Sequence, residues 1–437
     1  MLDIKYIREN PDLIKKGISS KNINPSLVDE FLAIDTNWRS VTKNVEDLRS
    51  DQKKAGEARD ITKAKLLKDE IKALEGTLKE LDEKRNAILR QIPNLPLSSV
   101  PIGKDETDNI VLREVGKKKV AFPIPKDYLS LGEELNIINI ERASKVSGSR
   151  FGYLIGDAAL LEFALVQLAF QTLGDEKKIK NIIRNKKLMV DSTPFIPVVP
   201  PVLIKSEMMA AMGYMDRSGE EIYSIQDDLY LVGTSEQSIG PMHAGETFAE
   251  IELPRRYVSF SSCFRREAGS YGKDTKGILR VHQFDKVEMF SITTPDKSEV
   301  EHQLLLAIEE HLMQLLKLPY HVLNICTGDL GDPAASKFDI EAWMPGQKNG
   351  LGEYRETHST SNTTDFQSRR LNIKYRKEGA DSDQGAEYVH MLNGTVFAIG
   401  RMLIAIIENY QNNNGKILVP KVLQKYLGKK VIKSLEH

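Results

Sequence analysis

The sequence predicts an α+β protein: an antiparallel sheet flanked by helices, preceded by an N-terminal antiparallel α-helical coiled-coil arm. Two heptad series run through residues 27–92, and strand and helix patterns alternate after residue 111. The segments Phe264–Ser270 and Arg280–Glu288 flank a Gly-bearing loop, as the strands of a hairpin do. We therefore expect an N-terminal domain at 1–110, with its hairpin at about 27–92, and a second domain at 111–437.

Composition narrows the class of protein. The 437 residues are 41% hydrophobic and 28% charged, which is typical of a globular domain with a sizeable core. The formal net charge is -1, so a nucleic-acid partner must meet a local basic patch. Only two cysteines occur, Cys263 and Cys326, which excludes a disulfide framework and disfavours a zinc site. No apolar run reaches the roughly 18 residues that span a bilayer, and the N-terminus lacks a signal-peptide pattern. We expect a cytoplasmic protein without a membrane partner.

The N-terminal arm is predicted from the spacing of its apolar residues. They alternate in steps of four and three along a first series: Leu27, Phe31, Ile34, Trp38, Val41, Val45 and Leu48. A second series has the same spacing and one charged member: Leu67, Ile71, Leu74, Leu78, Leu81, Arg85, Ile88 and Ile92. The polar stretch 51–61 contains Gly56 and predicts the break between two helices, the first about 25 residues and nearly 40 Å long. A spacer or dimerisation hairpin is one interpretation of this arm.

Basic residues near the predicted hairpin end favour a second interpretation. They are Arg49, Lys53, Lys54, Arg59 and Lys63. A rigid arm with a cationic end suits the phosphates of a nucleic acid. A run of charges by itself usually marks a solvated face, so this pattern alone is a weak signal.

The segments Phe264–Ser270 and Arg280–Glu288 carry the strongest chemical signal. If both are strands, Arg265 and Glu267 share one face, as do Arg280, His282 and Phe284. Guanidinium groups, carboxylates and an aromatic ring on one face can hold a phosphate, an amine and a base together. That set suits an enzyme that joins ATP to an amino acid. The intervening loop lacks the Lys-Ser/Thr pair of a P-loop, and no GxGxxG fingerprint occurs.

Five segments in register resemble the class II aminoacyl-tRNA synthetases. Residues 194–201, 264–288 and 393–410 are similar to the three motifs of that class, the first of them an element of its dimer interface. Residues 234–236 and 354–371 resemble the serine-binding and the ATP- and metal-side segments of the seryl-tRNA synthetase family, and the arm resembles its tRNA-binding arm. The resemblance covers essentially the whole chain. The family usually has small or thiol residues where Thr357, His358 and Thr360 stand.

The resemblance implies an activity, partners and site residues. The activity is formation of seryl-adenylate from L-serine and ATP with Mg²⁺, followed by transfer of serine to tRNA(Ser). The implied partners are tRNA(Ser), including its long variable arm, and a second copy of the chain in a homodimer. Implied serine-binding residues are Thr234, Ser235, Glu236, Arg265, Glu288, Asn393 and Thr395. Implied ATP-binding residues are Arg265, Arg266, Glu267, Phe284, Glu356, Thr357, His358, Ser359 and Arg401, with Arg265 and Arg401 catalytic and Glu356 and Ser359 as Mg²⁺ ligands. The implied tRNA-binding residues are the five basic residues of the arm.

Each implied role has a plainer structural alternative. Arg265 clamps the α-phosphate and the serine carboxylate, or forms a salt bridge with Glu267. Phe284 is a platform for adenine, or an ordinary core residue. Arg401 binds the γ-phosphate, or pairs with Glu408 seven residues further along its helix.

The chemistry also sets expectations for selectivity and for the second step. If the carboxylate of Glu288 accepts a hydrogen bond from the serine hydroxyl, the site should discriminate against alanine by a factor of ~10⁴ or more. No Ser-His-Asp set is evident, and His282 is a conceivable base but better suited to a structural role. Two alternatives remain open: a class II synthetase of another specificity, and a synthetase-like binding module that does not charge tRNA.

Overall fold

The computed structural model describes the chain except for residues 119–123, 217–218, 269–275, 378, 380–384 and 435–437. The chain divides into two compact units, Met1–Leu95 and Pro96–His437. Residues 96–110, which the sequence analysis placed with the N-terminal domain, lie in the second unit.

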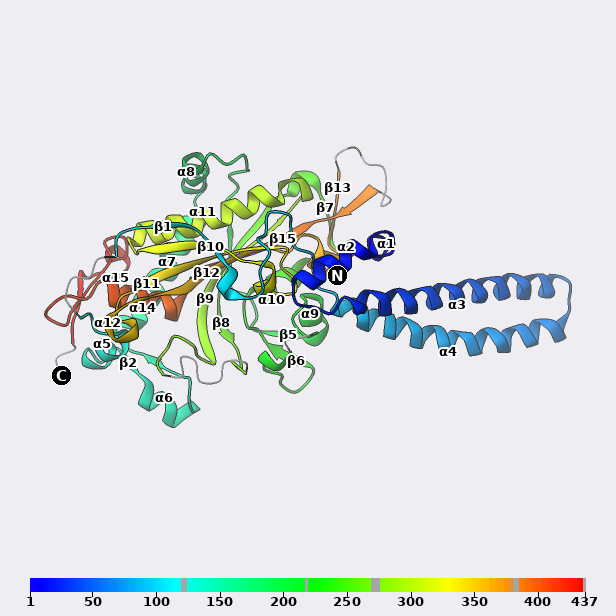
Figure 1. Ribbon diagram of the computed structural model, residues 1–437, viewed down its shortest axis with the longest axis horizontal. Coiled ribbons are helices and arrows are strands. Elements are labelled where there is room, and N and C mark those ends of the chain that lie inside the picture. The colour runs from blue at the N-terminus through cyan, green and yellow to red at the C-terminus, as the bar shows by residue number, and fades with distance from the viewer. Residues whose placement is uncertain (119–123, 217–218, 269–275, 378, 380–384, 435–437) are drawn as a thin grey trace. The chain divides into compact units, whose positions relative to one another are not determined.

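The first unit is entirely helical among its described elements. Its helices are α1 (Ile4–Glu9), α2 (Pro11–Ser20), α3 (Ser26–Glu57) and α4 (Ile61–Gln91). The long helices α3 and α4 lie side by side as an antiparallel hairpin, drawn in blue in Figure 1. Phe31 and Val45 of α3 and Ile71 of α4 are buried between them, which confirms the heptad prediction.

The turn of this hairpin is much shorter than the sequence predicted. Helix α3 continues for 32 residues to Glu57, so the break predicted over 51–61 was wrong. Gln, Lys, Glu and Ala are good helix formers, and one glycine inside a helix costs only about 1 kcal/mol. The chain reverses where Arg59 adopts a left-handed conformation (φ 58°) and Asp60 caps α4 by accepting from Lys63 N at 3.0 Å.

The second unit is built on one eight-stranded sheet (Figure 1). In spatial order its strands are β1 (Ile110–Val115), β10 (Tyr320–Asn324), β11 (Ser336–Met344), β12 (Glu353–Asn362), β15 (His390–Ala398), β9 (Gln283–Thr293), β8 (Arg255–Phe264) and β4 (Ile196–Val198). All neighbouring pairs are antiparallel except β4 and β8, which are parallel. The sheet is therefore antiparallel, as the sequence predicted, apart from one parallel pair at its edge.

The two faces of the sheet differ. Helices α7 (Asp157–Leu173), α11 (Ser298–Leu316) and α14 (Ile399–Asn409) pack with the strands in the main core, in which Leu165, Ile308 and Ile406 are fully buried. Along each strand, side chains point alternately into this core and to the other face of the sheet, where the cavity described below is found. A smaller core around Phe290 supports that second face.

Shorter elements complete the described part of the second unit. The helices are α5 (Tyr128–Glu134), α6 (Ile140–Ser147), α8 (Glu176–Lys186), α9 (Ser206–Ala211), α10 (Glu236–Ile239), α12 (Gln347–Gly350), α13 (Phe366–Leu371) and α15 (Gln424–Leu427). The strands are β2 (Ile138–Asn139), β3 (Tyr153–Leu154), β5 (Leu203–Lys205), β6 (Leu229–Leu231), β7 (Thr247–Ala249), β13 (Lys374–Arg376), β14 (Ala386–Tyr388), β16 (Ile417–Leu418) and β17 (Val431–Ile432). Among the helices described here, none combines the length and apolar character that a bilayer crossing requires.

The strands on either side of the Gly-bearing loop lie further from that loop than predicted. Strand β8 ends at Phe264 and β9 begins at Gln283, so Arg265 and Arg280 lie outside the ladder. One further backbone bond joins Arg265 N to His282 O at 2.9 Å, after which Arg266 N bonds Glu221 O instead. The predicted sharing of faces by period two was therefore wrong for these residues. Most of the loop itself, 269–275, lies outside the described residues.

Two β-bulges change which side chains reach the cavity face. In β12, Ile340 pairs with His358 and Glu341 pairs with Glu356, so Thr357 is the extra residue. A bulge of this kind bends the strand and redirects side chains. A similar shift lies between Thr395 and Phe397 in β15. Glu356 and Ser359 thereby reach the same face although three positions separate them.

Candidate active site

A cavity of about 730 Å³ opens on the face of the sheet away from α7, α11 and α14. Strands β9, β11, β12 and β15 provide its floor, and the start of α14 closes one side. The sequence-predicted residues that line it are Thr234, Glu236, Arg265, Glu267, Phe284, Glu288, Glu356, Thr357, Ser359, Asn393, Thr395 and Arg401. These residues come from segments up to 167 positions apart, between Thr234 and Arg401, and the sheet brings them together.

One end of the cavity combines a guanidinium group with an aromatic ring. The Cζ atom of Arg265 lies 5.3 Å from the ring centroid of Phe284, within the range of a cation–π contact. Arg265 Nε donates to the carbonyl oxygen of Gly233 at 3.3 Å, and its side chain is otherwise exposed to the cavity. Glu267 forms a salt bridge with Arg280 at 2.8 Å, and no ion pair between Glu267 and Arg265 is found in the described part of the chain. Arg265 is therefore positioned by Gly233 and Phe284 with its outer nitrogens directed to solvent.

At the same end, Arg401 is held by Glu356. Arg401 Nη1 lies 3.2 Å from Glu356 Oε2 and donates to the backbone oxygen of Glu356 at 3.0 Å. Glu408, the alternative partner, is buried and accepts from the backbone nitrogens of Tyr128 (3.1 Å) and Gly346 (2.8 Å). The helix-surface pair between Arg401 and Glu408 is thus absent from the structure.

The carboxyl group of Glu356 is held in its charged form. Burial alone would raise its pKa, but the positive charges of Arg401, Lys337 and Arg265 outweigh burial and hold the pKa at about 2. Ser359 lines the cavity on the same face. A carboxylate and a hydroxyl are oxygen donors of the kind that Mg²⁺ prefers, so these two residues fit that cation. Among the described residues, no group of three His, Cys, Asp or Glu side chains could form a metal site alone.

The other end of the cavity contains two buried carboxyl groups. Glu236 Oε2 accepts from Tyr214 OH at 2.8 Å, and Oε1 accepts from Gln367 Nε2 at 2.8 Å. Glu288 Oε2 lies 2.6 Å from Lys286 Nζ and accepts from Thr395 Oγ1 at 3.3 Å. Burial raises the pKa of both Glu236 and Glu288. This end can bind a small molecule that offers an ammonium group and a hydroxyl.

Three sequence-predicted residues do not line the cavity. Ser235 is fully buried, with its Oγ 2.7 Å from Ser259 Oγ. Arg266 is exposed. His358 points into the helix-covered core, where its ring lies 5.9 Å from that of Phe397 and burial lowers its pKa to about 3.

Sequence reasoning missed two lysines of this cavity. Lys286 stands two positions before Glu288 on the same strand, so alternation could have found it. Lys337 of β11 forms an ion pair with Asp339 at 2.9 Å and lines the cavity beside Glu356. Tyr214, the partner of Glu236, had no recognisable signal, because its segment precedes the serine-binding motif by 20 residues.

The five predicted tRNA-binding residues of the arm all lie exposed on the far half of the α3–α4 hairpin. Arg49 forms an ion pair with Glu75 at 2.8 Å, and Lys54 forms one with Asp51 at 3.1 Å. Lys53, Arg59 and Lys63 extend into solvent around the turn. Exposed pairs of this kind contribute only about 0–1 kcal/mol to stability, so the tip residues are available for binding.

Comparisons with known proteins identify the family of the chain. Residues 221–410 match the tRNA synthetase class II core domain (G, H, P, S and T), which defines the class of protein. Residues 1–96 match the seryl-tRNA synthetase N-terminal domain. The chain belongs to the seryl-tRNA synthetase family.

Full-length relatives support the same family. The chain is 43% identical to a serine–tRNA ligase of Acidothermus cellulolyticus over 99% of both chains, and 42% identical to one of Dictyoglomus turgidum over 98% of both. Among solved structures, it is similar to seryl-tRNA synthetase from Pyrococcus horikoshii complexed with ATP. That match has a TM-score of 0.87 and 39% identity, and covers 100% of both chains.

Proposed function

We propose that the chain is a serine–tRNA ligase that forms seryl-adenylate from L-serine and ATP and transfers the serine to tRNA(Ser). One observation carries the proposal: a single cavity joins the Arg265–Phe284 and Arg401–Glu356 pairs at one end to buried Glu236 and Glu288 at the other. ATP and an amino acid can therefore lie next to each other.

In the first step, a serine carboxylate oxygen attacks the α-phosphorus of ATP and pyrophosphate leaves. Arg265 lines the cavity close enough to both Glu356 and Glu288 for its charge to lower the pKa of each, and its planar fork suits both the α-phosphate and the carboxylate. The ring of Phe284 is proposed to lie under adenine. Arg401 is proposed to bind the γ-phosphate, for which it must loosen its contact with Glu356. Positioning and charge provide most of the rate enhancement in such reactions.

We propose that Glu356 and Ser359 hold Mg²⁺. The cation, when bound, would neutralise charge on the phosphates and assist the departure of pyrophosphate. The chain's own contribution is to keep Glu356 ionised through Arg401, Lys337 and Arg265. The bulge at Thr357 places the carboxylate and the hydroxyl on one face.

Selectivity for serine is proposed to come from the buried end. Glu236 and Thr234 would bind the ammonium group, and Glu288 with Thr395 would bind the hydroxyl. Alanine lacks the hydroxyl that Glu288 and Thr395 would bind, and a buried polar site that loses such a partner discriminates more strongly than the loss of an exposed contact would. Asn393 lies beside them on β15 and is nearly buried.

In the second step, a ribose hydroxyl of the terminal adenosine of tRNA attacks the adenylate carbonyl. The proton can pass to the phosphate of the leaving AMP, so no basic side chain is required. His282 does not line the cavity, and its Nδ1 lies 3.0 Å from the carbonyl oxygen of Arg265, so we assign it a structural role.

The remaining parts of the proposal concern partners and location. The exposed cations of the arm support binding of tRNA, and we propose the long variable arm of tRNA(Ser) as their target. Ile196 of edge strand β4 is 57% exposed and Val199, the residue after the strand, is 80% exposed, which supports a homodimer through this edge. A cytoplasmic location stays a prediction from sequence.

Serine-dependent exchange between ATP and pyrophosphate, followed by charging of tRNA(Ser), tests the proposal. We expect exchange with serine only and charging of tRNA(Ser) only. Exchange driven by a different amino acid would favour a synthetase of another specificity. Tight binding of tRNA without exchange or charging would favour a binding module.

A further inference from the structure

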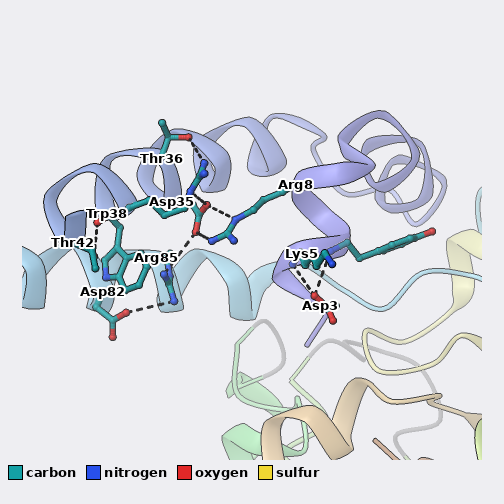
Figure 2. A network of polar contacts seen from close by, with 11 residues as sticks. Asp3, Lys5, Arg8, Asp35, Thr36, Trp38, Thr42, Asp82 and Arg85 are labelled. Atoms are coloured by element: carbon teal, nitrogen blue, oxygen red, sulfur yellow. Dashed lines mark hydrogen bonds and ion pairs between the residues drawn. The ribbon is translucent and has the colours of Figure 1, made fainter. Parts of the chain in front are cut away.

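A buried charge cluster joins three helices at the base of the arm (Figure 2). Asp35 of α3 is fully buried. Arg8 of α1 donates to both of its oxygens, from Nε to Oδ2 and from Nη2 to Oδ1, each at 2.7 Å. Arg39, one turn further along α3, donates to Oδ2 at 3.1 Å. Arg85 of α4 approaches Oδ1 at 3.7 Å.

Arg85 occupies a core position of the second heptad series. Its Cζ lies 4.0 Å from the ring centroid of Trp38, the facing core residue of α3. Its two ion-pair distances, to Asp35 and to Asp82, are both 3.7 Å and too long for hydrogen bonds. Its Nε atom is buried without a hydrogen-bond partner.

The contacts of Arg85 are too long to stabilise the hairpin much, but they can specify how its two helices pair. Buried ion pairs with imperfect geometry often contribute nothing to stability, and apolar replacements can be neutral or better. A single polar residue in a coiled-coil core is, however, a known way to fix the register of two helices.

The far end of the hairpin, residues 49–66, specifies the register of the two helices weakly. Of the described residues from 49 to 66, only Ala55 is buried, while Ile61 is 81% and Leu66 67% exposed. A slip of one heptad would place Arg85 against Phe31 or Val45, both buried apolar residues, in place of Trp38. It would also remove Arg85 from Asp35. A slip of one heptad between α3 and α4 is therefore unfavourable at the base of the arm, whereas few buried contacts oppose it at the tip.

We propose that Asp35 and Arg85, with Arg8, form a register lock that positions the arm for its tRNA. Asp35 is a positioning residue under this assignment, since it acts through the direction and reach of α3 and α4. The link to tRNA rests on the proposed function, whereas the lock itself does not.

Disulfide cross-linking of the full chain measures the register directly. Arg49 and Glu75 face each other, so the pair Arg49→Cys with Glu75→Cys reports the native register. Arg49→Cys with Lys68→Cys reports the slip of one heptad that brings Arg85 to Phe31. The native cysteines are buried. We expect only the native pair to cross-link in the otherwise unchanged chain.

The same pairs are then placed in a background in which Arg8, Asp35 and Arg85 are all changed to Leu. We expect this variant to stay helical and thermally stable. The yield of the slipped cross-link should reach at least about a tenth of the yield of the native cross-link. Lys79→Leu, at an exposed position of α4, is the control for adding apolar surface and should give the native cross-link only.

Activity of the triple variant without added cysteines completes the test. We expect serine-dependent exchange within twofold of the unchanged enzyme and tRNA charging at least tenfold slower, through a higher KM for tRNA. A single native cross-link in the triple variant would overturn the register lock. A slipped cross-link with normal tRNA charging would keep the lock and overturn its role in tRNA positioning. Absence of charging by the unchanged enzyme would instead count against the proposed function.

Discussion

Arg401 and Glu356 hold each other across the cavity, with Arg401 Nη1 3.2 Å from Glu356 Oε2. The pair joins the first turn of α14 to the middle strand β12, and both partners are proposed to bind ATP or its metal. The contact therefore occupies, in the free protein, the groups that the substrate needs.

The first prediction concerns this pair. Glu356→Gln should raise the Mg²⁺ concentration for half-maximal exchange by about tenfold or more, because the carboxylate is the one anionic donor proposed for the cation. Magnesium titration of the exchange rate, together with Mn²⁺ binding in the presence of ATP followed by electron paramagnetic resonance, checks this. An unchanged Mg²⁺ dependence would place the cation elsewhere.

The second prediction concerns Arg265. Arg265→Ala should lower the exchange rate by about 10²–10³ or more, because the variant loses charge stabilisation of the attacked phosphate. Its unfolding temperature should stay within a few degrees, since within the described part of the chain the Arg265 side chain makes one hydrogen bond, to Gly233. Arg142→Ala, an exposed substitution on α6, is the matched control. Normal exchange in Arg265→Ala contradicts the assigned role.

The third prediction concerns serine selectivity. Glu288→Ala should reduce the ratio of serine to alanine in kcat/KM for exchange by about 10² or more, because the hydroxyl loses its buried acceptor. Exchange rates measured with both amino acids give the ratio. If the ratio survives while both rates fall together, Glu288 supports the fold of the site and not its selectivity.

The fourth prediction concerns pH. Burial, and the nearby carboxylate of Asp285, raise the pKa of Glu162 to about 8, above the ordinary value of 4.5 that applies when unfolded. The unfolded chain thus releases this proton first, and stability falls as pH rises from about 4.5 to 8. Glu162→Gln should remove a part of this fall, at most about 1.4 kcal/mol per pH unit. Urea unfolding of both chains at pH 5.5 and 8.5 measures it; equal pH dependence refutes the assignment.

The fifth prediction concerns the arm. Deletion of 46–78, closed by a short glycine-containing turn, removes all five basic tip residues and leaves the Asp35 cluster intact. We expect exchange within twofold of the full chain and tRNA charging reduced by about 10² or more, with a weaker dependence on salt because phosphate contacts are lost. Equal loss of both steps would mean that the far half of the arm supports the catalytic unit.

Much of this site was predictable because its residues stand in regular patterns. The heptad spacing from Phe31 to Val45 predicted the arm, and Glu288 does lie in a strand, β9, as predicted. The motif residues Arg265, Glu356 and Arg401 line one cavity, as the resemblance implied.

What sequence reasoning missed depends on local departures from those patterns. The predicted alternation of side chains between the two faces was wrong just beyond Phe264, because the backbone there leaves the strand ladder and bonds Glu221 instead. The hairpin turn was placed too broadly, because polar residues near Gly56 continue a helix as readily as they end one. Buried Asp35 could not be predicted, because α1 covers it from outside the heptad pattern.

The extra residue at Thr357 affects how this enzyme tolerates changes in chain length. In a regular strand, removal of one residue turns every side chain beyond it to the opposite side of the sheet. Here the bulge already contains a surplus residue, so losing Thr357 would restore plain alternation and keep Glu356 and Ser359 together. The carboxylate would move along the strand by about 3.3 Å and would not be turned away. Evolution can therefore adjust the spacing of these two oxygen donors at this position without dismantling the strand.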